Sequence, residues 1–136
     1  MSGGDGVQTA EFLHLAGPDG EGVLASNPGV PLASMPGGVS FEQKFSAKYG
    51  KIQNYSPYAY DAVNVLIAAM QRAGSADPAK YLPELAKTNM TGVTGPIQFD
   101  GKGDLTNGNV TVYQVNGGKW APVETVKNAA PASATP

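Results

Sequence analysis

The sequence predicts an α/β fold in which helices pack on a small sheet and the chain ends in a β-hairpin. The stretch SPYAYDAVNVLIAAMQRAGS places apolar side chains three and four residues apart, which is the spacing of an amphipathic helix. Beyond residue 90 the pattern changes to short segments typical of strands, GPIQFD, NVTVYQV and KWAPVETV. The last two flank Asn116, Gly117 and Gly118, whose tolerance of positive φ favours a tight hairpin turn.

The composition is that of a globular protein and excludes several kinds of site. The chain has 136 residues, of which 41% are hydrophobic, so we expect one compact unit with its own core. A net charge of −2 favours neither nucleic acid nor an anionic membrane as a partner. Because cysteine is absent, disulfides, thiolate nucleophiles and Cys-based zinc sites are excluded. The longest apolar run, VNVLIAAM, is much shorter than the roughly 20 residues that span a bilayer.

The N-terminal half predicts a helix, a strand and a loop in that order. TAEFLHLAG is expected to form a short helix with Thr9 as N-cap and Gly17 as its end, followed by a turn in GPDGEG. GVLAS at 22–26 is mostly apolar and predicts a short strand. Residues 27–38 hold so many Pro and Gly residues that we expect a long surface loop.

Three further helices are expected before the strands. Ser40 and Gln43 form a capping box for FEQKFSAKYG, which Gly50 ends. In the next helix Ser56 is the expected N-cap, Pro57 the first helical residue and Gly74 the end, with a core stripe of Ala59, Ala62, Val63, Leu66, Ile67 and Met70. The last helix begins at Asp77 and Pro78, and Pro83 should kink it or delay its regular part.

Catalytic, metal and cofactor motifs are not supported. DGKGDLTNGN fails as a calcium loop, because Lys102, Leu105 and Thr111 stand where an oxygen ligand, a glycine and a glutamate are needed. His14 has no second His or Cys for zinc chemistry and is expected to be a partly exposed helix residue. Dinucleotide, Walker and GxSxG motifs are absent. We therefore expect neither an enzyme nor a bound metal or cofactor.

Two stretches are candidates for ligand contact. In GGDG, Asp5 stands among Gly3, Gly4 and Gly6, which predicts either a flexible surface turn or an unusually accessible acid. Tyr55, Tyr58 and Tyr60 cluster at a helix N-terminus. Aromatic rings beside the positive end of a helix suit one wall of a ligand cleft, whereas core packing is the alternative for at least two of them.

Six segments in order resemble the last third of the type I periplasmic binding proteins, most closely the Leu/Ile/Val-binding receptors of ABC transporters. They are SGGDGVQTAEFLHLAG, EGVLASNP, FEQKFSAKYG, YSPYAYDAVNVLIAAMQRAGS, GVTGPIQFDGKGDL and NVTVYQVNGGKW. The similarity spans residues 2 to about 126, and the YAYDAV helix start and GPIQFDGKGDL are its most specific parts.

The resemblance implies a fold and a site. In this family two α/β lobes close on an amino acid. Residues 1–127 would contribute to both lobes, crossing near GVLAS and again after GPIQF, with residues 128–136 as a disordered tail. The resemblance assigns Asp5 to the ligand ammonium group, lets the ligand approach closely at Gly6, and places Tyr55 against the ligand from the other lobe. It also implies a periplasmic location, no cofactor, and membrane subunits of an ABC transporter as partners.

The family's first two thirds do not match any part of this sequence, and residues 27–38 form a longer crossing than the family predicts. We therefore expect a fragment, and any export signal outside this chain, because the N-terminus lacks a basic region followed by an apolar one. The strands GVLAS, GPIQFD and NVTVYQV would then expose unpaired backbone groups. The alternative function is accordingly a non-binding interaction module that self-associates as a homo-oligomer.

Overall fold

The chain divides into two compact units instead of the single unit expected from its length. The computed structural model describes residues 1–127, so the predicted disordered tail, residues 128–136, lies outside the described residues. Unit 1 consists of Met1–Pro31 and residues 108–127, and unit 2 consists of Leu32–Asn107. The chain passes between the units after Pro31 and after Asn107. Length limits how much core a chain can form, but it does not say into how many pieces that core is divided.

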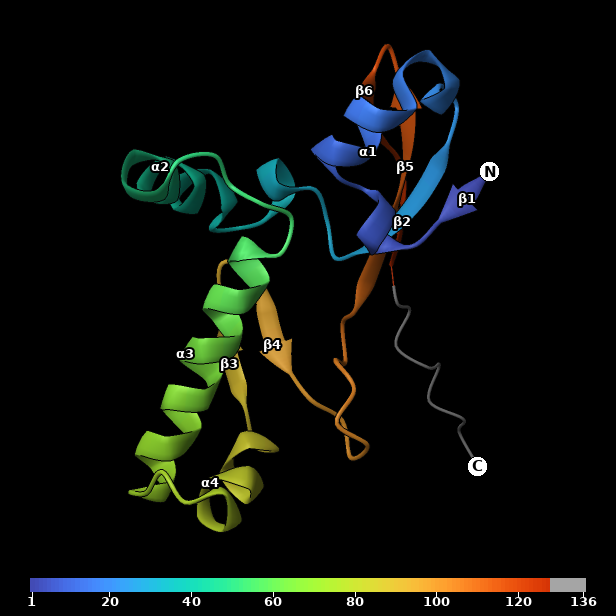
Figure 1. Ribbon diagram of the computed structural model, residues 1–136. Helices are drawn as coiled ribbons and strands as arrows, with labels where there is room; N and C mark the ends of the chain where they lie inside the picture. Colours follow the sequence, from blue (N-terminus) through green and yellow to red (C-terminus); the bar gives the residue numbers. More distant parts are fainter. Residues whose placement is uncertain (128–136) are drawn as a thin grey trace, which may run out of the picture. The chain divides into compact units, whose positions relative to one another are not determined.

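Unit 1 is built on a four-stranded sheet. The strand order is β1 (Ser2–Gly3), β2 (Leu24–Pro28), β5 (Asn109–Asn116) and β6 (Lys119–Lys127), as Figure 1 shows. β1 runs parallel to β2, and the other neighbours are antiparallel. β5 is therefore paired along both edges, and β2 is paired along one edge and at Leu24 and Ala25 of the other, so the expectation of unpaired backbone groups is wrong for β5 and partly wrong for β2. The strand within GPIQFD has one neighbouring strand among the described residues, so the expectation holds along its other edge. β2 begins two residues later than GVLAS predicts, and β1 was not predicted.

Short helices connect β1 to β2 in unit 1: η1 (Asp5–Val7), α1 (Ala10–Ala16) and η2 (Gly17–Gly20). As predicted, α1 begins after Thr9, whose hydroxyl accepts a hydrogen bond from Phe12 N at 3.0 Å, and ends at Gly17. The Phe12 ring lies 5.5 Å from that of Trp120 on β6, and the Trp120 indole N–H donates to the Thr9 carbonyl at 3.1 Å. These contacts hold α1 against the sheet.

The β5–β6 hairpin turns where the sequence predicts. Gly117 and Gly118 have φ values of +58° and +71°, which glycine adopts without strain. The Glu21 carboxylate accepts hydrogen bonds from both glycine N–H groups, at 3.0 and 3.3 Å. The hairpin turn is thus tied to the segment that leads into β2.

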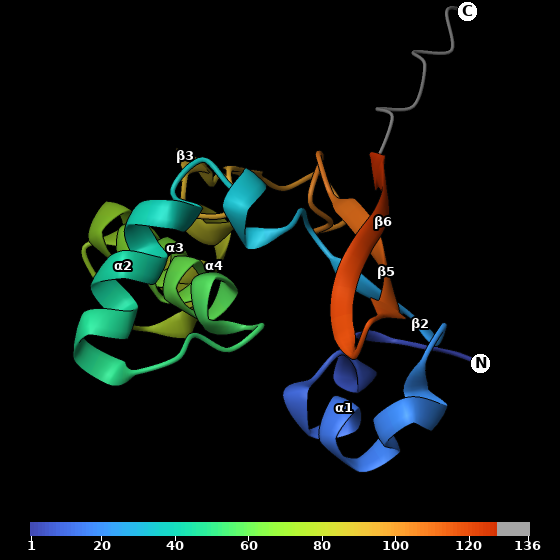
Figure 2. The same ribbon diagram turned by 90° about the horizontal axis from the view of Figure 1, so that it is seen from above.

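Unit 2 contains the longer helices and a two-stranded sheet. The short helix η3 (Leu32–Ser34) precedes α2 (Gly38–Tyr49), α3 (Ser56–Ala73) and α4 (Pro78–Leu85). β3 (Asn89–Thr91), which was not predicted, pairs antiparallel with β4 (Pro96–Gln98). Figure 1 shows α3 running alongside this strand pair, and Figure 2 shows α3 next to α4. No helix among the described residues is long and apolar enough to cross a membrane.

α3 buries a different face from the predicted one. Its buried residues recur every four positions: Pro57, Asp61, Val65 and Ala69. The predicted core stripe is largely exposed, by 55% at Val63, 36% at Leu66 and 47% at Ile67. The periodicity correctly predicts the helix, but it cannot tell which of two apolar sides the rest of this chain covers.

The start of α2 also differs from the prediction. α2 begins at Gly38 without a side-chain cap, so Ser40 lies inside the first turn instead of capping it. A Cβ at Gly38 would collide with the Leu32 carbonyl oxygen, so close packing of the preceding η3 turn fixes this start. Residues 27–38 are accordingly not a surface loop throughout, since they include the end of β2, η3 and the buried Met35.

The remaining helix boundaries are close to the predicted ones. Gly50 and Gly74, with φ values of +82° and +60°, end α2 and α3 as expected. α3 begins at Ser56 itself, with Tyr55 as its N-cap residue. Asp77 caps α4 by accepting a hydrogen bond from Ala79 N at 3.0 Å.

Candidate functional site

The acid predicted to meet a ligand lies at the carboxyl ends of two parallel strands. Asp5 opens η1 directly after β1, and β1 and β2 end at the same edge of the sheet because they are parallel. In open α/β sheets this edge is where ligands bind. Asp5 is half-buried, and its Oδ1 accepts a hydrogen bond from Gly6 N at 3.0 Å.

The glycines around Asp5 have different roles. A Cβ at Gly4 or Gly6 would meet no atom within 4 Å apart from the adjacent residues, so packing does not require glycine at either position. A Cβ at Gly3 would lie 2.7 Å from Cγ2 of Val7, so glycine is needed there for η1 to pack against β1. GGDG therefore leads into the short helical turn η1, and a role of Asp5 in ligand contact stays a prediction.

A buried polar cluster of Gln8, Asn27 and Tyr113 lies next to the end of η1. Gln8 follows η1 and is 7% exposed, and its Oε1 accepts a hydrogen bond from the Asn27 side-chain amide of β2. Gln8 is also hydrogen-bonded to Tyr113. Burial raises the pKa of the Tyr113 hydroxyl, and the Gln8 hydrogen bond partly opposes this effect. The cluster fixes the end of η1 to β2 and β5, and so it holds Asp5 in place.

The predicted aromatic residue lies in unit 2, at the N-terminus of α3. Tyr55 is 49% exposed and is the N-cap residue of that helix. The turn ahead of it is closed by the Ser56 hydroxyl, which accepts a hydrogen bond from Gln53 N at 3.2 Å. Tyr60 is 52% exposed as well, whereas Tyr58 is half-buried. The alternative that at least two of these three tyrosines are core residues is therefore wrong.

The three predicted ligand residues are divided between the units. Asp5 and Gly6 belong to unit 1, and Tyr55 belongs to unit 2. Neither unit brings all three together.

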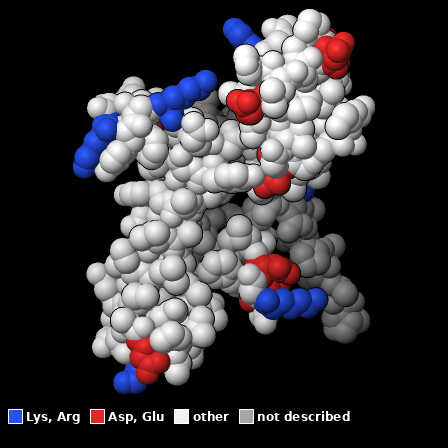
Figure 3. All heavy atoms as spheres, viewed as in Figure 1, with Lys and Arg blue, Asp and Glu red and all other residues white. Residues whose placement is uncertain are grey.

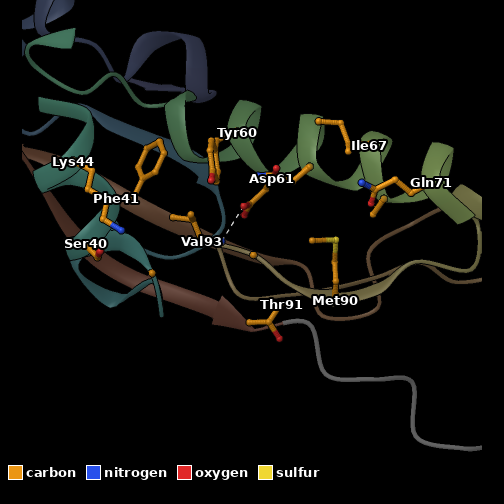
Figure 4. A pocket seen from close by; sticks show the side chains of 14 residues that line it. Ser40, Phe41, Lys44, Tyr60, Asp61, Ile67, Gln71, Met90, Thr91 and Val93 are labelled. Carbon is orange, nitrogen blue, oxygen red and sulfur yellow. Dashed lines mark hydrogen bonds between the residues drawn. The ribbon is translucent and has the colours of Figure 1, made fainter. Parts of the chain in front are cut away.

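Unit 2 contains a pocket of about 560 Å³, shown in Figure 4. α2, α3, β3 and the turn after β3 line it, and Figure 4 shows the labelled side chains together with the hydrogen bond between Asp61 and Val93. Its polar lining residues are Ser40, Lys44, Asn64, Gln71 and Thr91. The apolar part comes from Phe41, Ile67, Ala68, Met90 and Val93.

Asp61 forms part of this pocket and has a structural role that the sequence analysis missed. It is 4% exposed, and its carboxylate accepts hydrogen bonds from Val93 N, Thr94 N and the Thr94 hydroxyl at 2.9, 2.8 and 2.7 Å. Gly92 allows this approach, because a Cβ there would lie 2.5 Å from Cγ of Asp61. The carboxylate is thus satisfied by the turn between β3 and β4. An acid in the middle of the apolar YAYDAV stretch was the available signal.

No cluster of three or more His, Asp or Glu residues that could hold a metal ion occurs within residues 1–127. His14 is exposed on α1, as predicted. In the segment that resembled a calcium loop, Oδ1 of Asp100 accepts hydrogen bonds from Lys102 N and Asp104 N at 2.8 and 3.0 Å. That carboxylate organises its own turn.

Comparison with known proteins gives consistent matches. The family described as "Periplasmic binding protein" matches residues 3–119. The chain is 35% identical over 118 residues to the leucine-, isoleucine-, valine-, threonine-, and alanine-binding protein of Pseudomonas aeruginosa. That match covers 82% of this chain and 30% of the relative. The chain thus spans about 30% of the length of the curated relatives it matches first.

Solved structures agree with the sequence matches. A leucine binding protein from Thermotoga maritima is similar with a TM-score of 0.81 and 30% identity, covering 93% of this chain and 37% of that chain. The substrate binding protein of a branched-chain amino acid transporter from Streptococcus pneumoniae, solved with isoleucine, has a TM-score of 0.77 at 24% identity. It covers 93% of this chain and 36% of that chain, and it supports the likeness in fold. The predicted α/β class is confirmed.

Proposed function

Because this chain belongs to the periplasmic binding protein family, we propose that it forms part of the solute-binding component of an ABC transporter for branched-chain or related amino acids. One observation carries the proposal: Asp5 stands at the carboxyl ends of β1 and β2 with open glycine positions on both sides. The ligand class is supported by the 35% identical relative, whose name includes leucine, isoleucine, valine, threonine and alanine.

The proposed role of Asp5 follows from the cost of burying a charge. An amino acid enclosed by protein brings an ammonium group out of water, and that group needs an acceptor with negative charge. Asp5 supplies a carboxylate held by η1, while Gly6 lets the ligand approach the backbone closely. The Gln8–Asn27 hydrogen bond keeps η1 in this position.

Tyr55 is proposed to cover the apolar side chain of the ligand. Its side chain is 49% exposed at the N-terminus of α3. Covering an aliphatic side chain with an aromatic ring removes apolar area from water, so the gain increases with the size of the ligand side chain.

The location and partners are proposals on the same basis. A solute-binding component of this kind works in the periplasm, delivers its ligand to the transporter's membrane subunits and performs no chemistry on it. Units 1 and 2 would each belong to one of the two lobes, so that residues 1–127 contribute to both. The proposed function requires no cofactor.

A chimera tests the proposed function. In the P. aeruginosa relative, the segment that matches this chain is replaced by residues 1–127, and leucine is titrated by calorimetry. We expect leucine binding that is lost or strongly weakened by Asp5→Asn and unaffected by Asp19→Asn, an exposed acid in η2 of the same unit. A folded chimera that does not bind any of the five amino acids in the relative's name would refute the proposal.

A second candidate role has one observation in its favour. The exposed aliphatic side chains of α3, among them Val63 and Ile67, suit self-association of the chain as a non-binding homo-oligomer. Light scattering distinguishes the two roles, because a stable monomer at micromolar concentration excludes the self-associating module.

A further inference from the structure

Two Asn–Gly steps occur in the sequence, and the structure places them in different surroundings. They are Asn107–Gly108, where the chain leaves unit 2, and Asn116–Gly117, in the β5–β6 hairpin turn. Glycine has no Cβ, so the backbone nitrogen that follows the asparagine can approach the side-chain amide carbon closely. An Asn–Gly step is therefore especially open to spontaneous deamidation, and the fold decides whether each step reacts.

Deamidation at such a step consumes water and needs no catalyst. At Asn107 the Gly108 backbone nitrogen gives up its proton and bonds to Cγ, while the bond from Cγ to Nδ2 breaks and ammonia leaves with that proton. Water then opens the five-membered imide at either carbonyl group, giving its hydroxyl to the carbon and its proton to the nitrogen. One opening leaves aspartate at position 107, and the other leaves isoaspartate, in which the main chain runs through Cβ.

The hairpin step is protected by Glu21. Gly117 N donates a hydrogen bond to Glu21 Oε1 at 3.0 Å, so the nitrogen that would attack Asn116 is already engaged. The negative carboxylate also disfavours loss of the Gly117 proton. Asn116 pairs with Lys119 in the β5–β6 ladder, which restrains its backbone as well. Releasing a hydrogen bond to a charged group slows the attack by about tenfold to a hundredfold.

The step at Asn107 lacks this protection. Gly108 N–H donates no hydrogen bond to any group within residues 1–127. The Asn107 side chain is exposed, and its Nδ2 donates to the Pro96 carbonyl oxygen at 3.1 Å. This hydrogen bond joins neutral groups at the surface, so releasing it slows the attack by only about two- to tenfold.

The charges of the loop after β4 do not replace Glu21. This loop holds Asp100, Lys102 and Asp104, and Figure 3 shows acidic and basic atoms together in the region where Figure 1 draws it. Oδ1 of Asp100 accepts hydrogen bonds from Lys102 N and Asp104 N, so this carboxylate is directed at its own turn. Because Lys102 offsets part of the negative charge, these acids suppress proton loss at Gly108 less than Glu21 does in the hairpin.

We propose that Asn107 is a deamidation site of the folded protein, and that Glu21 protects Asn116 from the same reaction. The two steps have the same chemistry and both asparagines are exposed. The hydrogen bond that must be released is charge-assisted at one step and neutral at the other, and this difference selects the site.

Deamidation of Asn107 changes how the loop is held. A carboxylate cannot donate to the Pro96 carbonyl, so the hydrogen bond that joins Asn107 to β4 is lost. The same loop is joined to β4 by Thr106 N, which donates to the Gln98 carbonyl at 3.0 Å. The modification therefore adds a negative charge and weakens the attachment of the chain at the point where it leaves unit 2.

Peptide mapping by mass spectrometry tests the selectivity. The full chain is incubated in mildly alkaline buffer, and the increase in peptide mass distinguishes deamidation from isomerisation of the nearby Asp100–Gly101 step, which leaves the mass unchanged. The chain unfolded in guanidinium chloride gives the reference rates. Folding should slow the reaction about two- to tenfold at Asn107 and about tenfold or more at Asn116. Equal slowing at the two sites, or no reaction at Asn107 in the folded chain, would overturn the proposal.

Substitution of Glu21 isolates the protecting contact. Glu21→Ala should speed deamidation of Asn116 in the folded chain by about tenfold and leave Asn107 unchanged. Glu21→Gln, which keeps one acceptor oxygen without the charge, should give a smaller increase. Asp19→Ala is the matched control, since Asp19 is an exposed acid in η2 of the same unit. Equal rates at Asn116 in Glu21→Ala and Asp19→Ala would refute the protective role.

Hydrogen exchange tests the consequence for the loop. Asn107→Asp has the carboxylate that one route of deamidation produces, and it should speed amide exchange at Thr106 relative to the parent chain. Asn107→Ser, which keeps a side-chain donor, should raise this exchange less. Unchanged exchange at Thr106 in Asn107→Asp would refute the weakened attachment.

Discussion

Replacing Gly92 by alanine should destabilise unit 2, because the new methyl group collides with a buried carboxylate. The Cβ would lie 2.5 Å from Cγ and 2.6 Å from Oδ1 of Asp61, whereas ordinary contacts begin near 3.4 Å. Asp61 cannot move away freely, since it is 4% exposed and is held by hydrogen bonds from Val93 N, Thr94 N and the Thr94 hydroxyl. Either the turn between β3 and β4 shifts, or these hydrogen bonds lengthen.

The magnitude follows from these two effects. Inserting a methyl group into a close-packed site costs about 1–3 kcal/mol. Losing one hydrogen bond to a charged group adds about 1.5–3 kcal/mol. We therefore expect the free energy of unfolding to fall by about 2.5–6 kcal/mol. For a unit of this size each kcal/mol lowers the midpoint of thermal unfolding by roughly 4–8 °C.

Circular dichroism at the helical band measures this effect, because α2, α3 and α4 all belong to unit 2. Gly101→Ala is the matched control in the same unit, since a Cβ there meets nothing within 4 Å. A double-mutant cycle isolates the cause: in an Asp61→Ala background, Gly92→Ala should cost much less than in the parent protein. If Gly92→Ala and Gly101→Ala unfold at the same temperature, the packing argument is refuted.

Three further predictions concern the proposed site and the pH dependence of stability. In the chimera, Asp5→Asn should weaken leucine binding by about 2–5 kcal/mol, and a calorimetric change of less than about twofold would contradict its pairing with an ammonium group. Tyr55→Ala should reduce the affinity for leucine more than that for alanine, whereas equal losses would place the ring outside the site. Backbone hydrogen bonds, first from Lys102 and then from Asp104, lower the pKa of Asp100 below its ordinary 3.8. The ionised Asp100 carboxylate therefore stabilises the fold above the ordinary pKa, and this stabilisation is lost as the pH falls through the lowered pKa. In a plot of urea midpoint against pH, Asp100→Asn should reduce the dependence on pH over this acidic range. Identical plots for the parent protein and Asp100→Asn would contradict the prediction.

Local signals in the sequence predict the helix ends well. Thr9 and Asp77 cap their helices through side-chain oxygens, and Gly17, Gly50 and Gly74 end theirs with positive φ. Each of these devices depends on one residue and its immediate backbone, so neighbouring residues are enough to identify it. Ser40 is not the cap, because α2 begins two residues before it, at Gly38, which packs against the η3 turn at Leu32.

The sequence predicts single residues of the candidate site but not the contacts that position them. An acid among glycines is visible in GGDG. The structure adds that this acid follows a strand of a parallel pair and that the positions of Gly4 and Gly6 are unobstructed. The support from Gln8 and Asn27 joins residues 19 positions apart and leaves no local pattern. Asp61 likewise contacts a turn more than 30 residues away. Contacts of this kind depend on tertiary structure, which a single sequence does not reveal.

The apolar stripe of α3 shows how a correct pattern leads to a wrong core. Spacing of three and four residues identifies side chains that share a face, but it does not identify what covers that face. Here two faces are apolar: the one that contains Val65 and Ala69 is buried, and the one that contains Val63 and Ile67 is exposed. Contact between an apolar face of this length and water costs free energy, and a helix inside a protein avoids this cost. The uncharged sequence from Ala62 to Gln71 is therefore explained by a fold larger than unit 2, in which both faces are covered.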